Sequence, residues 1–131
     1  MKRPTYFKGS ETVEVKILDA ADTKFNFDDI IILKGKKILS IETFNATDKG
    51  KTPNQNDTIN DNAFKDGFLV IHDDRREIIN RLSLAALRTA QTNGILKRWI
   101  LKNIDWQKSY IIFGSAINLV KDEAALFTFY Y

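Results

Sequence analysis

Apolar and polar residues alternate in several short stretches of the chain, which follow one another at intervals of about eight to twelve residues. The clearest stretch is 12–18, where valine or isoleucine at every second position is separated by Glu14 and Lys16. Successive side chains of a strand point to opposite faces, so this period of two predicts a half-buried β-strand. Further strands are predicted from the short apolar segments at 25–33, 38–44 and 68–72.

A basic turn, Lys34-Gly35-Lys36-Lys37, separates two of these apolar segments. The segment before it contains the run Ile30-Ile31-Ile32-Leu33, which is typical of a strand buried on both faces. We therefore predict a β-hairpin over residues 30–44. The lysines are interpreted as a solvated turn, because a phosphate-binding loop would need more glycine and a helix after it.

The largest concentration of aromatic and β-branched residues lies at 99–113 and contains both tryptophans of the chain, Trp99 and Trp106. Such residues favour a pleated, half-buried surface, so the segment is predicted to be one long strand or two strands that share a bend. Residues 124–131 form a further strand with apolar side chains on both faces. We expect this strand to be central, or covered from outside the chain, and to pair with 99–113.

The one helix candidate is the segment 77–92, in which Ile78, Ile79, Leu82 and later alanines recur at spacings of three and four. Asn93-Gly94 would end such a helix. An alternative reading splits the segment, with residues 77–82 extended and only 83–92 helical, since Ser83 is itself a good helix cap. Both readings stay open from the pattern alone.

These elements predict a mainly β fold, an antiparallel β-sandwich or jelly-roll-like barrel with one short helix. The length of 131 residues fits one domain, which we place at 11–131 after an N-terminal arm at 1–10. Aspartate outnumbers glutamate by twelve to five, and there are ten asparagines. Because these short side chains bond to nearby backbone, they favour turns and caps, as expected for many short strands.

Residues 45–67 form the longest irregular segment and are rich in Asn, Asp, Thr and Gly. A loop of this length in a compact domain is usually functional or flexible. Its only large apolar residues, Ile59 and Phe64, could attach it to the body of the domain. The spacing of its acidic and amide side chains does not match a helix-loop-helix calcium site, so a flexible or partner-contacting loop is the favoured interpretation.

Composition narrows the class of protein further. The chain has no cysteine, which excludes disulfides, thiolate metal sites and cysteine nucleophiles and fits a reducing cytoplasm. The N-terminal residues lack the apolar segment of a secretion signal, and no apolar run is long enough to span a membrane. We therefore expect no export and no membrane span.

No sequence motif for catalysis is present: there is no glycine-rich phosphate loop, no zinc-protease motif and no serine-hydrolase motif. The single histidine, His72, precedes Asp73 and Asp74, but no nucleophile is placed beside it by spacing. We interpret it as structural and expect no enzyme activity, no cofactor and no metal.

Basic residues interleaved with aromatic ones are typical of surfaces that bind nucleic acid. Such clusters occur at Lys2-Arg3, Tyr6-Phe7-Lys8 and Lys97-Arg98-Trp99. However, the net charge is only +3, and aromatic residues in alternating strands usually belong to the core. Nucleic-acid binding is therefore kept as an alternative and is not favoured.

The layout of short strands around one short helix, with Asp-Trp-Gln-Lys-Ser-Tyr-Ile-Ile at 105–112 and Leu-Phe-Thr-Phe-Tyr-Tyr at 126–131, resembles small virion proteins of bacterial viruses built on a β-sandwich or jelly roll. The resemblance covers residues 11–131 and carries over no functional residue. It implies a capsid, vertex, spike or minor coat role in the virion, assembled in the host cytoplasm.

We therefore expect a non-enzymatic structural protein that binds copies of itself or other virion proteins through the arm, the 45–67 loop and the aromatic C-terminal strand. A nucleic-acid-binding β-domain and a small enzyme with an unrecognised site remain the alternatives. The residues expected to make the assembly contacts are Tyr6, Phe7, Ile59, Phe64, Phe127, Phe129 and Tyr131.

Overall fold

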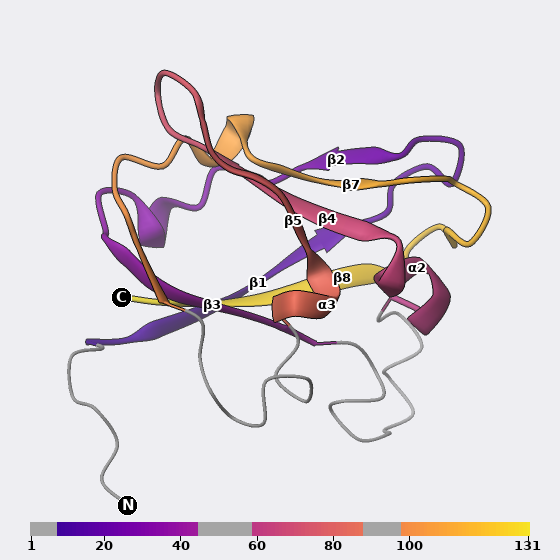
Figure 1. Cartoon of the computed structure of the whole chain (residues 1–131), viewed down its shortest axis with the longest axis horizontal. Coiled ribbons are helices and arrows are strands. Elements are labelled where there is room, and N and C mark those ends of the chain that lie inside the picture. The colour runs from indigo at the N-terminus through magenta and orange to yellow at the C-terminus, as the bar shows by residue number, and fades with distance from the viewer. Residues whose placement is uncertain (1–7, 45–58, 88–97) are drawn as a thin grey trace, which may run out of the picture.

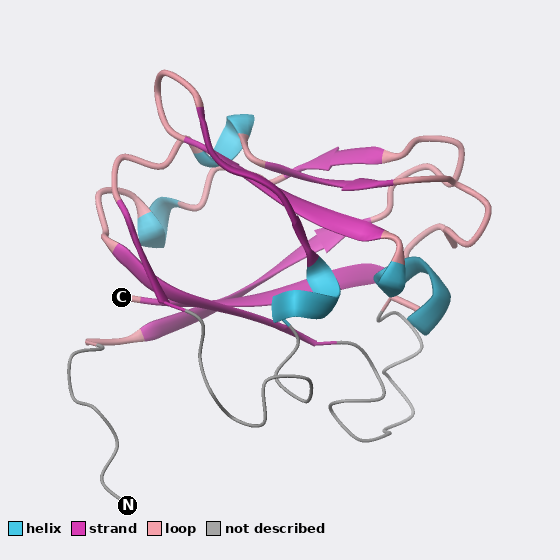
Figure 2. Ribbon diagram, viewed as in Figure 1, coloured by secondary structure: helices cyan, strands magenta, loops and turns pink. Residues whose placement is uncertain are grey.

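The computed structural model describes residues 8–44, 59–87 and 98–131, and these residues form two four-stranded antiparallel sheets packed face to face (Figures 1 and 2). The first sheet has the order β1-β8-β3-β6, and its strands are β1 (Ser10–Lys16), β8 (Ala124–Tyr130), β3 (Ile38–Phe44) and β6 (Arg98–Leu101). The second sheet has the order β2-β7-β4-β5, and its strands are β2 (Lys24–Asn26), β7 (Tyr110–Phe113), β4 (Gly67–His72) and β5 (Glu77–Ser83).

The strand order is that of a jelly roll. Strands β1 and β8, β2 and β7, β3 and β6, and β4 and β5 are paired, as in one long hairpin folded back on itself. The pairings β3–β8 and β4–β7 then join these strand pairs side by side into the two sheets. Only the β4–β5 connection stays within one sheet, and this double Greek-key path defines the jelly roll. The prediction of an antiparallel β-sandwich is confirmed, in its open form and not as a closed barrel.

An aromatic cluster fills the space between the sheets near one end of the sandwich. Phe27 follows β2 and lies with its ring centroid 5.9 Å from that of Trp106, 5.5 Å from Phe127 and 6.0 Å from Phe129. Trp106 and Phe129 are closer still, at 4.9 Å and nearly edge to face. All four side chains are buried. Edge-to-face rings add to the free energy of burial, so this cluster is a main contact that joins the two sheets.

Strand β8 is central, as predicted from its two apolar faces. It pairs with β1 on one side and with β3 on the other. Ala125, Phe127 and Phe129 point into the core, and the Thr128 hydroxyl on the outer face lies 3.0 Å from that of Thr12 across the strand pair. Residues 8–10 of the expected arm extend this pairing, because Gly9 and Tyr131 exchange backbone hydrogen bonds.

The expected pairing of 99–113 with the closing strand is wrong. The segment forms two strands in different sheets, β6 and β7, joined by the 3-10 turn η4 (Trp106–Lys108). Strand β6 pairs with β3, whereas β7 pairs with β2 and β4. The Asp105 carboxylate accepts the Lys108 N–H at 3.2 Å and so stabilises η4. The turn buries Trp106 at the point where the chain crosses between the sheets.

The predicted hairpin over residues 30–44 is also wrong. Strand β2 ends at Asn26, and the isoleucine run forms the 3-10 turn η1 (Ile31–Leu33) with only Ile30 and Leu33 buried. The Leu33 and Lys34 N–H groups bond to the Ile30 and Ile31 carbonyls, each at 3.0 Å. A short apolar run fits a buried strand and a helical turn equally well. The connection from β2 to β3 must cross between the sheets. The run lies in this connection and therefore forms a turn rather than a strand.

The long helix predicted at 77–92 is wrong in its first half, and the split alternative is correct there. Residues 77–83 form strand β5, followed by the short helix α3 (Leu84–Leu87); residues 88–92 lie outside the described part. Ile79 pairs with Ile71 and Leu82 with Leu69, so three residues of β5 span two of β4. This bulge, where Arg81 has φ 54°, places two core-facing side chains three apart. The spacing therefore imitates a helix.

The structure also contains a helix that the pattern did not predict, α2 (Asp61–Lys65), inside the expected 45–67 loop. Asn60 caps it by accepting the Ala63 N–H at 3.0 Å. Ile59 and Phe64 are fully buried and attach this segment to the sandwich, as anticipated. Residues 45–58 lie outside the described part.

Replacement of Phe129 by alanine tests the aromatic cluster. We expect the free energy of unfolding to fall by about 3–5 kcal/mol, because the change leaves a cavity at the contact between the sheets. Urea unfolding measures this loss. Phe129→Leu should cost less and serves if the alanine variant does not fold, and Ile117→Ala, on an exposed side chain, is the control, expected within about 0.5 kcal/mol of wild type. A loss below about 1 kcal/mol for Phe129→Ala would contradict the role of the cluster.

Candidate assembly surfaces

Most of the residues expected to contact other subunits are not on the surface. Ile59, Phe64, Phe127 and Phe129 each have 0% of their surface exposed, so the expectation is wrong for these four. Their aromatic or aliphatic character reflects the core of the chain itself. Tyr131 is half-buried against the core, and the Lys36 ammonium lies 4.6 Å from its ring centroid. Tyr6 and Phe7 lie outside the described residues.

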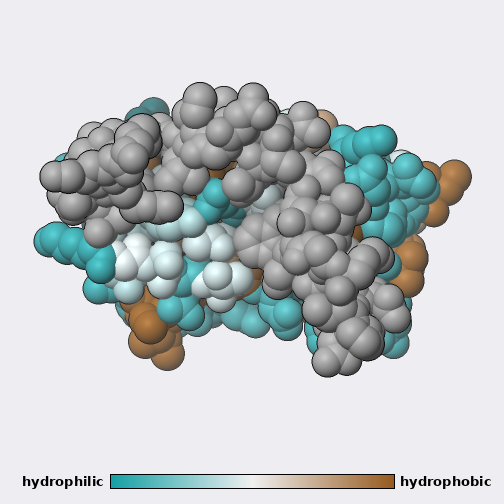
Figure 3. Space-filling model, turned by 90° about the horizontal axis from the view of Figure 1, so that it is seen from below, coloured by the Kyte–Doolittle hydropathy of each residue, from teal (hydrophilic) through white to brown (hydrophobic). Residues whose placement is uncertain are grey.

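The exposed large apolar side chains in the described part of the chain are aliphatic and lie in the connections at the two ends of the sandwich. At one end are Leu18, Ile117 and Val120, with exposed fractions of 69%, 85% and 50%. At the other end are Ile31 and Ile32, with 76% and 54%. Figure 3 shows apolar surface, in brown, near both ends of the longest axis. Contiguous apolar surface with a polar rim is typical of interaction sites.

The first of these ends, which we call the acidic end, consists of residues 17–23, 59–66 and 114–123. The Ile17 N–H donates to the Glu123 carbonyl and the Asp122 N–H donates to the Ile17 carbonyl, both at 2.8 Å. The connection that carries Leu18 therefore lies directly beside the one that carries Ile117 and Val120. Both are seen at the right of Figure 1, where the 114–123 connection runs near α2.

Helix α2 holds the 114–123 connection at both of its ends. The Asn60 amide donates to the Asn118 carbonyl and to the Glu123 carboxylate, each at 2.8 Å. At the other end, the Asp66 carboxylate accepts the Ser115 N–H at 2.9 Å, and a Cβ on Gly114 would come within 2.6 Å of this carboxylate. The exposed aliphatic side chains are therefore presented on a preorganised loop, which limits the entropy lost when a partner binds.

The acidic end has a clear excess of negative charge. Its described residues include two lysines, Lys65 and Lys121, against six carboxylates: Asp19, Asp22, Asp61, Asp66, Asp122 and Glu123. Asp19 and Asp22 lie in the same connection as Leu18, and Asp122 and Glu123 follow Val120. The exposed apolar side chains at this end thus share their connections with acidic groups.

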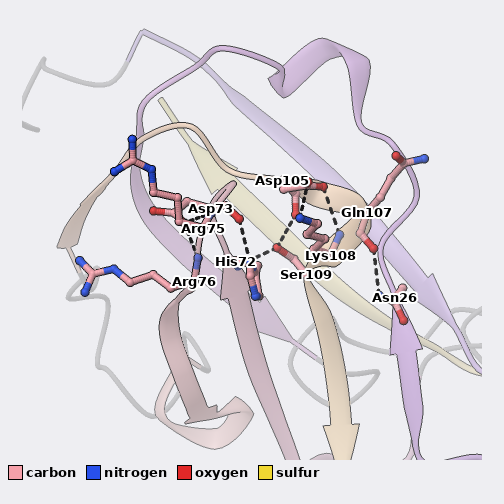
Figure 4. A network of polar contacts seen from close by, with 9 residues as sticks. All are labelled: Asn26, His72, Asp73, Arg75, Arg76, Asp105, Gln107, Lys108 and Ser109. Atoms are coloured by element: carbon pink, nitrogen blue, oxygen red, sulfur yellow. Dashed lines mark hydrogen bonds and ion pairs between the residues drawn. The ribbon is translucent and has the colours of Figure 1, made fainter.

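The opposite end, which we call the basic end, consists of residues 27–37, 73–76 and 102–109. A network of hydrogen bonds joins these connections (Figure 4). The Asp105 N–H donates to the His72 carbonyl at 2.8 Å, and the buried Ser109 hydroxyl accepts the His72 N–H at 3.0 Å and donates to the Asp105 carbonyl at 2.9 Å. The Phe27 N–H in turn donates to the Ser109 carbonyl at 3.0 Å. Three separate turns therefore form one stable unit.

Asp73 organises the turn between β4 and β5. Its carboxylate accepts the backbone N–H groups of Arg75 at 2.7 Å and Arg76 at 2.8 Å. These two bonds, first the one from Arg75, lower the pKa of Asp73 below its ordinary value. The turn exposes the side chains of Arg75 and Arg76. The described residues of the basic end include five aspartates and seven basic residues, namely Lys34, Lys36, Lys37, Arg75, Arg76, Lys102 and Lys108.

His72 contributes to this network mainly through its backbone. Its ring Nδ1 lies 2.7 Å from the Asp73 carbonyl oxygen, which can only accept, so Nδ1 carries the proton. Within the described residues, no group of three or more histidine, cysteine, aspartate or glutamate side chains is arranged to hold a metal ion. The contacts of His72 given by the structure are those of a residue that joins two turns.

The outer face of the second sheet carries a smaller polar cluster. The Lys24 ammonium lies 4.2 Å from the centroid of the Tyr110 ring, and the Tyr110 hydroxyl donates to Glu77 at 3.2 Å. Burial, followed by this bond to Glu77, raises the pKa of Tyr110. Lys24 and Tyr110 thus form a single pair of a basic and an aromatic residue on the outer face of the sheet. Of the clusters noted for nucleic-acid binding, 2–3, 6–7 and 97 lie outside the described residues, and Lys8 donates its N–H to the Tyr131 carbonyl.

Comparison with known proteins finds no match to a family model, to a curated protein or to a solved structure. Among the described residues, no helix is both long and apolar enough to cross a membrane. The exposed aliphatic side chains and the charge at the two ends of the sandwich make these ends the candidate functional surfaces. Sequence reasoning missed them because it searched for aromatic residues in strands.

Replacement of Asn60 by alanine tests how the acidic end is held. The variant loses the helix cap and the side-chain bonds to Asn118 and Glu123, so we expect the free energy of unfolding to fall by about 1–2 kcal/mol. Backbone amides of 114–123 should also exchange faster with solvent, as measured by hydrogen exchange. Asn62→Ala, an exposed position in the same helix, is the matched control. Equal exchange in both variants would show that Asn60 does not hold this connection.

The Asp73 turn gives the protein a defined response to acid. A carboxylate whose pKa is lowered on folding contributes stability in full above its unfolded pKa of about 3.9, and this contribution is lost as the pH falls through the folded pKa. Wild type should therefore lose more stability than Asp73→Asn between pH 5 and pH 3, as measured by urea unfolding. Asp74→Asn, which accepts neither bond, should behave as wild type. An equal loss in Asp73→Asn and wild type would refute this role of Asp73.

Proposed function

We propose that the protein is a non-enzymatic structural subunit of a homo-oligomeric assembly, and that this assembly is part of the virion of a bacterial virus. The observation that carries the proposal is the exposure of large aliphatic side chains at the two ends of an otherwise well-packed sandwich: Leu18, Ile117 and Val120 at one, Ile31 and Ile32 at the other. Each such side chain releases free energy, about 25 cal/mol per Å², when a partner covers it.

The rigidity of both ends supports an assembly role. Helix α2 fixes the connection that carries Ile117, and the hydrogen bonds of Asp73, Asp105 and Ser109 fix the turns at 73–76 and 102–109 at the other end. Rigid loops lose little conformational entropy on binding, so even a modest apolar contact gives net affinity. Loops that close over a small substrate usually have the opposite property, because they must move.

The interior gives less support to a ligand-binding role. Rings of Phe27, Trp106, Phe127 and Phe129 fill the space between the sheets near the basic end, at centroid distances of 4.9–6.0 Å. The surface of the protein is therefore a better candidate than the interior for the functional site. Jelly-roll sandwiches occur in viral capsid proteins, and also in lectins and cupins, so the fold agrees with a virion role without assigning it.

Sedimentation velocity over a wide range of protein concentration tests self-assembly. We expect the mass of the wild type to rise with concentration to multiples of 15.1 kDa, up to a closed ring or an open filament. A monomer that persists at the highest concentration would overturn the self-assembly proposal. Nuclease treatment is the control, because association that disappears with the nucleic acid, or that weakens steeply across a salt series with oligonucleotides, would favour the nucleic-acid alternative.

The virion part of the proposal has its own test. Quantitative mass spectrometry of purified virus particles should detect the chain at a fixed copy number per particle. Its absence from particles, combined with its presence in the soluble fraction of infected cells, would refute a virion role and leave the self-assembly result intact.

A further inference from the structure

We infer that copies of this chain associate head to tail, with the acidic end of one copy bound to the basic end of the next. This inference rests on the proposed function and specifies its contact. The acidic end presents Leu18, Ile117 and Val120, and the basic end presents Ile31 and Ile32. The partner that fits each end is therefore a second copy of the chain.

The charges favour contact between unlike ends. The acidic end has six carboxylates and two lysines among its described residues, whereas the basic end has seven basic residues and five aspartates. Two acidic ends brought together would place like charges opposite one another around an apolar contact, which is costly when they are desolvated. An acidic end against a basic end brings opposite charges together around the same apolar centre. Electrostatic complementarity of this kind favours the correct partner and the correct orientation.

The basic end has a small excess of positive charge, with seven basic residues against five aspartates, of which Asp28, Asp29 and Asp74 are exposed. Asp73 is directed at the backbone of its own turn, and Asp105 bonds to the backbone and lies 4.0 Å from the Lys108 ammonium. Arg75 and Arg76 each donate their backbone N–H to the Asp73 carboxylate, and within the described part of the chain no ion pair is found for their exposed side chains. These guanidinium groups are the natural counterparts of exposed carboxylates such as Asp22.

The exposed apolar side chains at each end, which we call the apolar centre of that end, are held facing outward. At the acidic end Leu119 is buried between the exposed Ile117 and Val120, and at the basic end the buried Leu33 follows the exposed Ile31 and Ile32. In each case the buried residue fixes the turn so that its neighbours face outward. The two centres lie at opposite ends of the sandwich (Figures 1 and 3). Each contact therefore leaves one end of each type available, and association continues until a ring closes or an open filament forms.

Two variants with one blocked end each provide the test. Variant A, Ile117→Lys with Val120→Lys, places positive charge at the acidic end. Variant B, Ile31→Glu with Ile32→Glu, places negative charge at the basic end. Because all four side chains are exposed, both variants should fold with a stability close to wild type. Each change removes apolar contact and adds repulsion from the opposite end, so each should weaken self-association about 100-fold or more.

A mixture of the two variants gives the decisive result. Variant A keeps a native basic end and variant B a native acidic end, so an equimolar mixture should form a 1:1 dimer and nothing larger, as measured by native mass spectrometry. The two altered ends carry opposite charges, but exposed ion pairs are too weak to replace an apolar contact. Glu14→Lys with Lys16→Glu, exposed on the outer face of β1, is the control and should assemble like wild type.

Other outcomes overturn the inference in distinguishable ways. If wild type assembles and only one of the two variants alone still assembles fully, the contact joins two like ends. If both variants alone assemble like wild type, the contact lies elsewhere on the molecule. If neither variant assembles and the mixture also stays monomeric, the native unlike ends do not bind each other. In each of these cases the proposed assembly function survives and only the head-to-tail arrangement fails. If wild type itself is monomeric at every concentration, the proposed self-assembly fails as well.

Discussion

The aromatic contact of Phe27 and Trp106 with β8 is central to the structure because both residues lie where the chain crosses between the sheets. In a jelly roll nearly every connection crosses from one sheet to the other, and each crossing passes an end of the sandwich, where the space between the sheets would otherwise be open. Here Phe27 and Trp106 bury their rings on Phe127 and Phe129, so the connections themselves become part of the core. The polar groups of the same turns are then free to bond to one another at the surface, as Asp105 and Ser109 do.

This arrangement explains why the two ends, and not the sheet faces, carry the exposed aliphatic side chains. A connection that contributes one side chain to the core must turn its neighbours outward. Leu33 and Leu119 are the inward members of such turns, and Ile32 and Val120 are the outward ones. The charge that distinguishes the ends is carried by the same connections. Packing and assembly are therefore coupled through the same short segments.

The fold class could be predicted from the sequence because it depends on local patterns: apolar and polar residues alternate in β1, and β8 is a short segment rich in aromatic residues. Pairing could not, since two apolar strands such as β6 and β8 show no sign of which neighbour each will take. The β5 bulge at Arg81 changed a period of two into a spacing of three, and the run at Ile31 fitted two structures equally well. The assembly residues were predicted from aromatic character, and that character belonged to the core. Leu18 and Ile117 become visible only when the exposure of each connection is known.

The central position of β8 has a consequence for the order in which the protein can fold. Both neighbours of this strand, β1 and β3, precede it by more than eighty residues along the chain. Contacts between segments so far apart form slowly, because a long loop must close before they are made. During synthesis on the ribosome, the edges of β1 and β3 that β8 will occupy stay unpaired until residues 124–130 have emerged. In that interval the incomplete sheet is most exposed to pairing with the wrong chain.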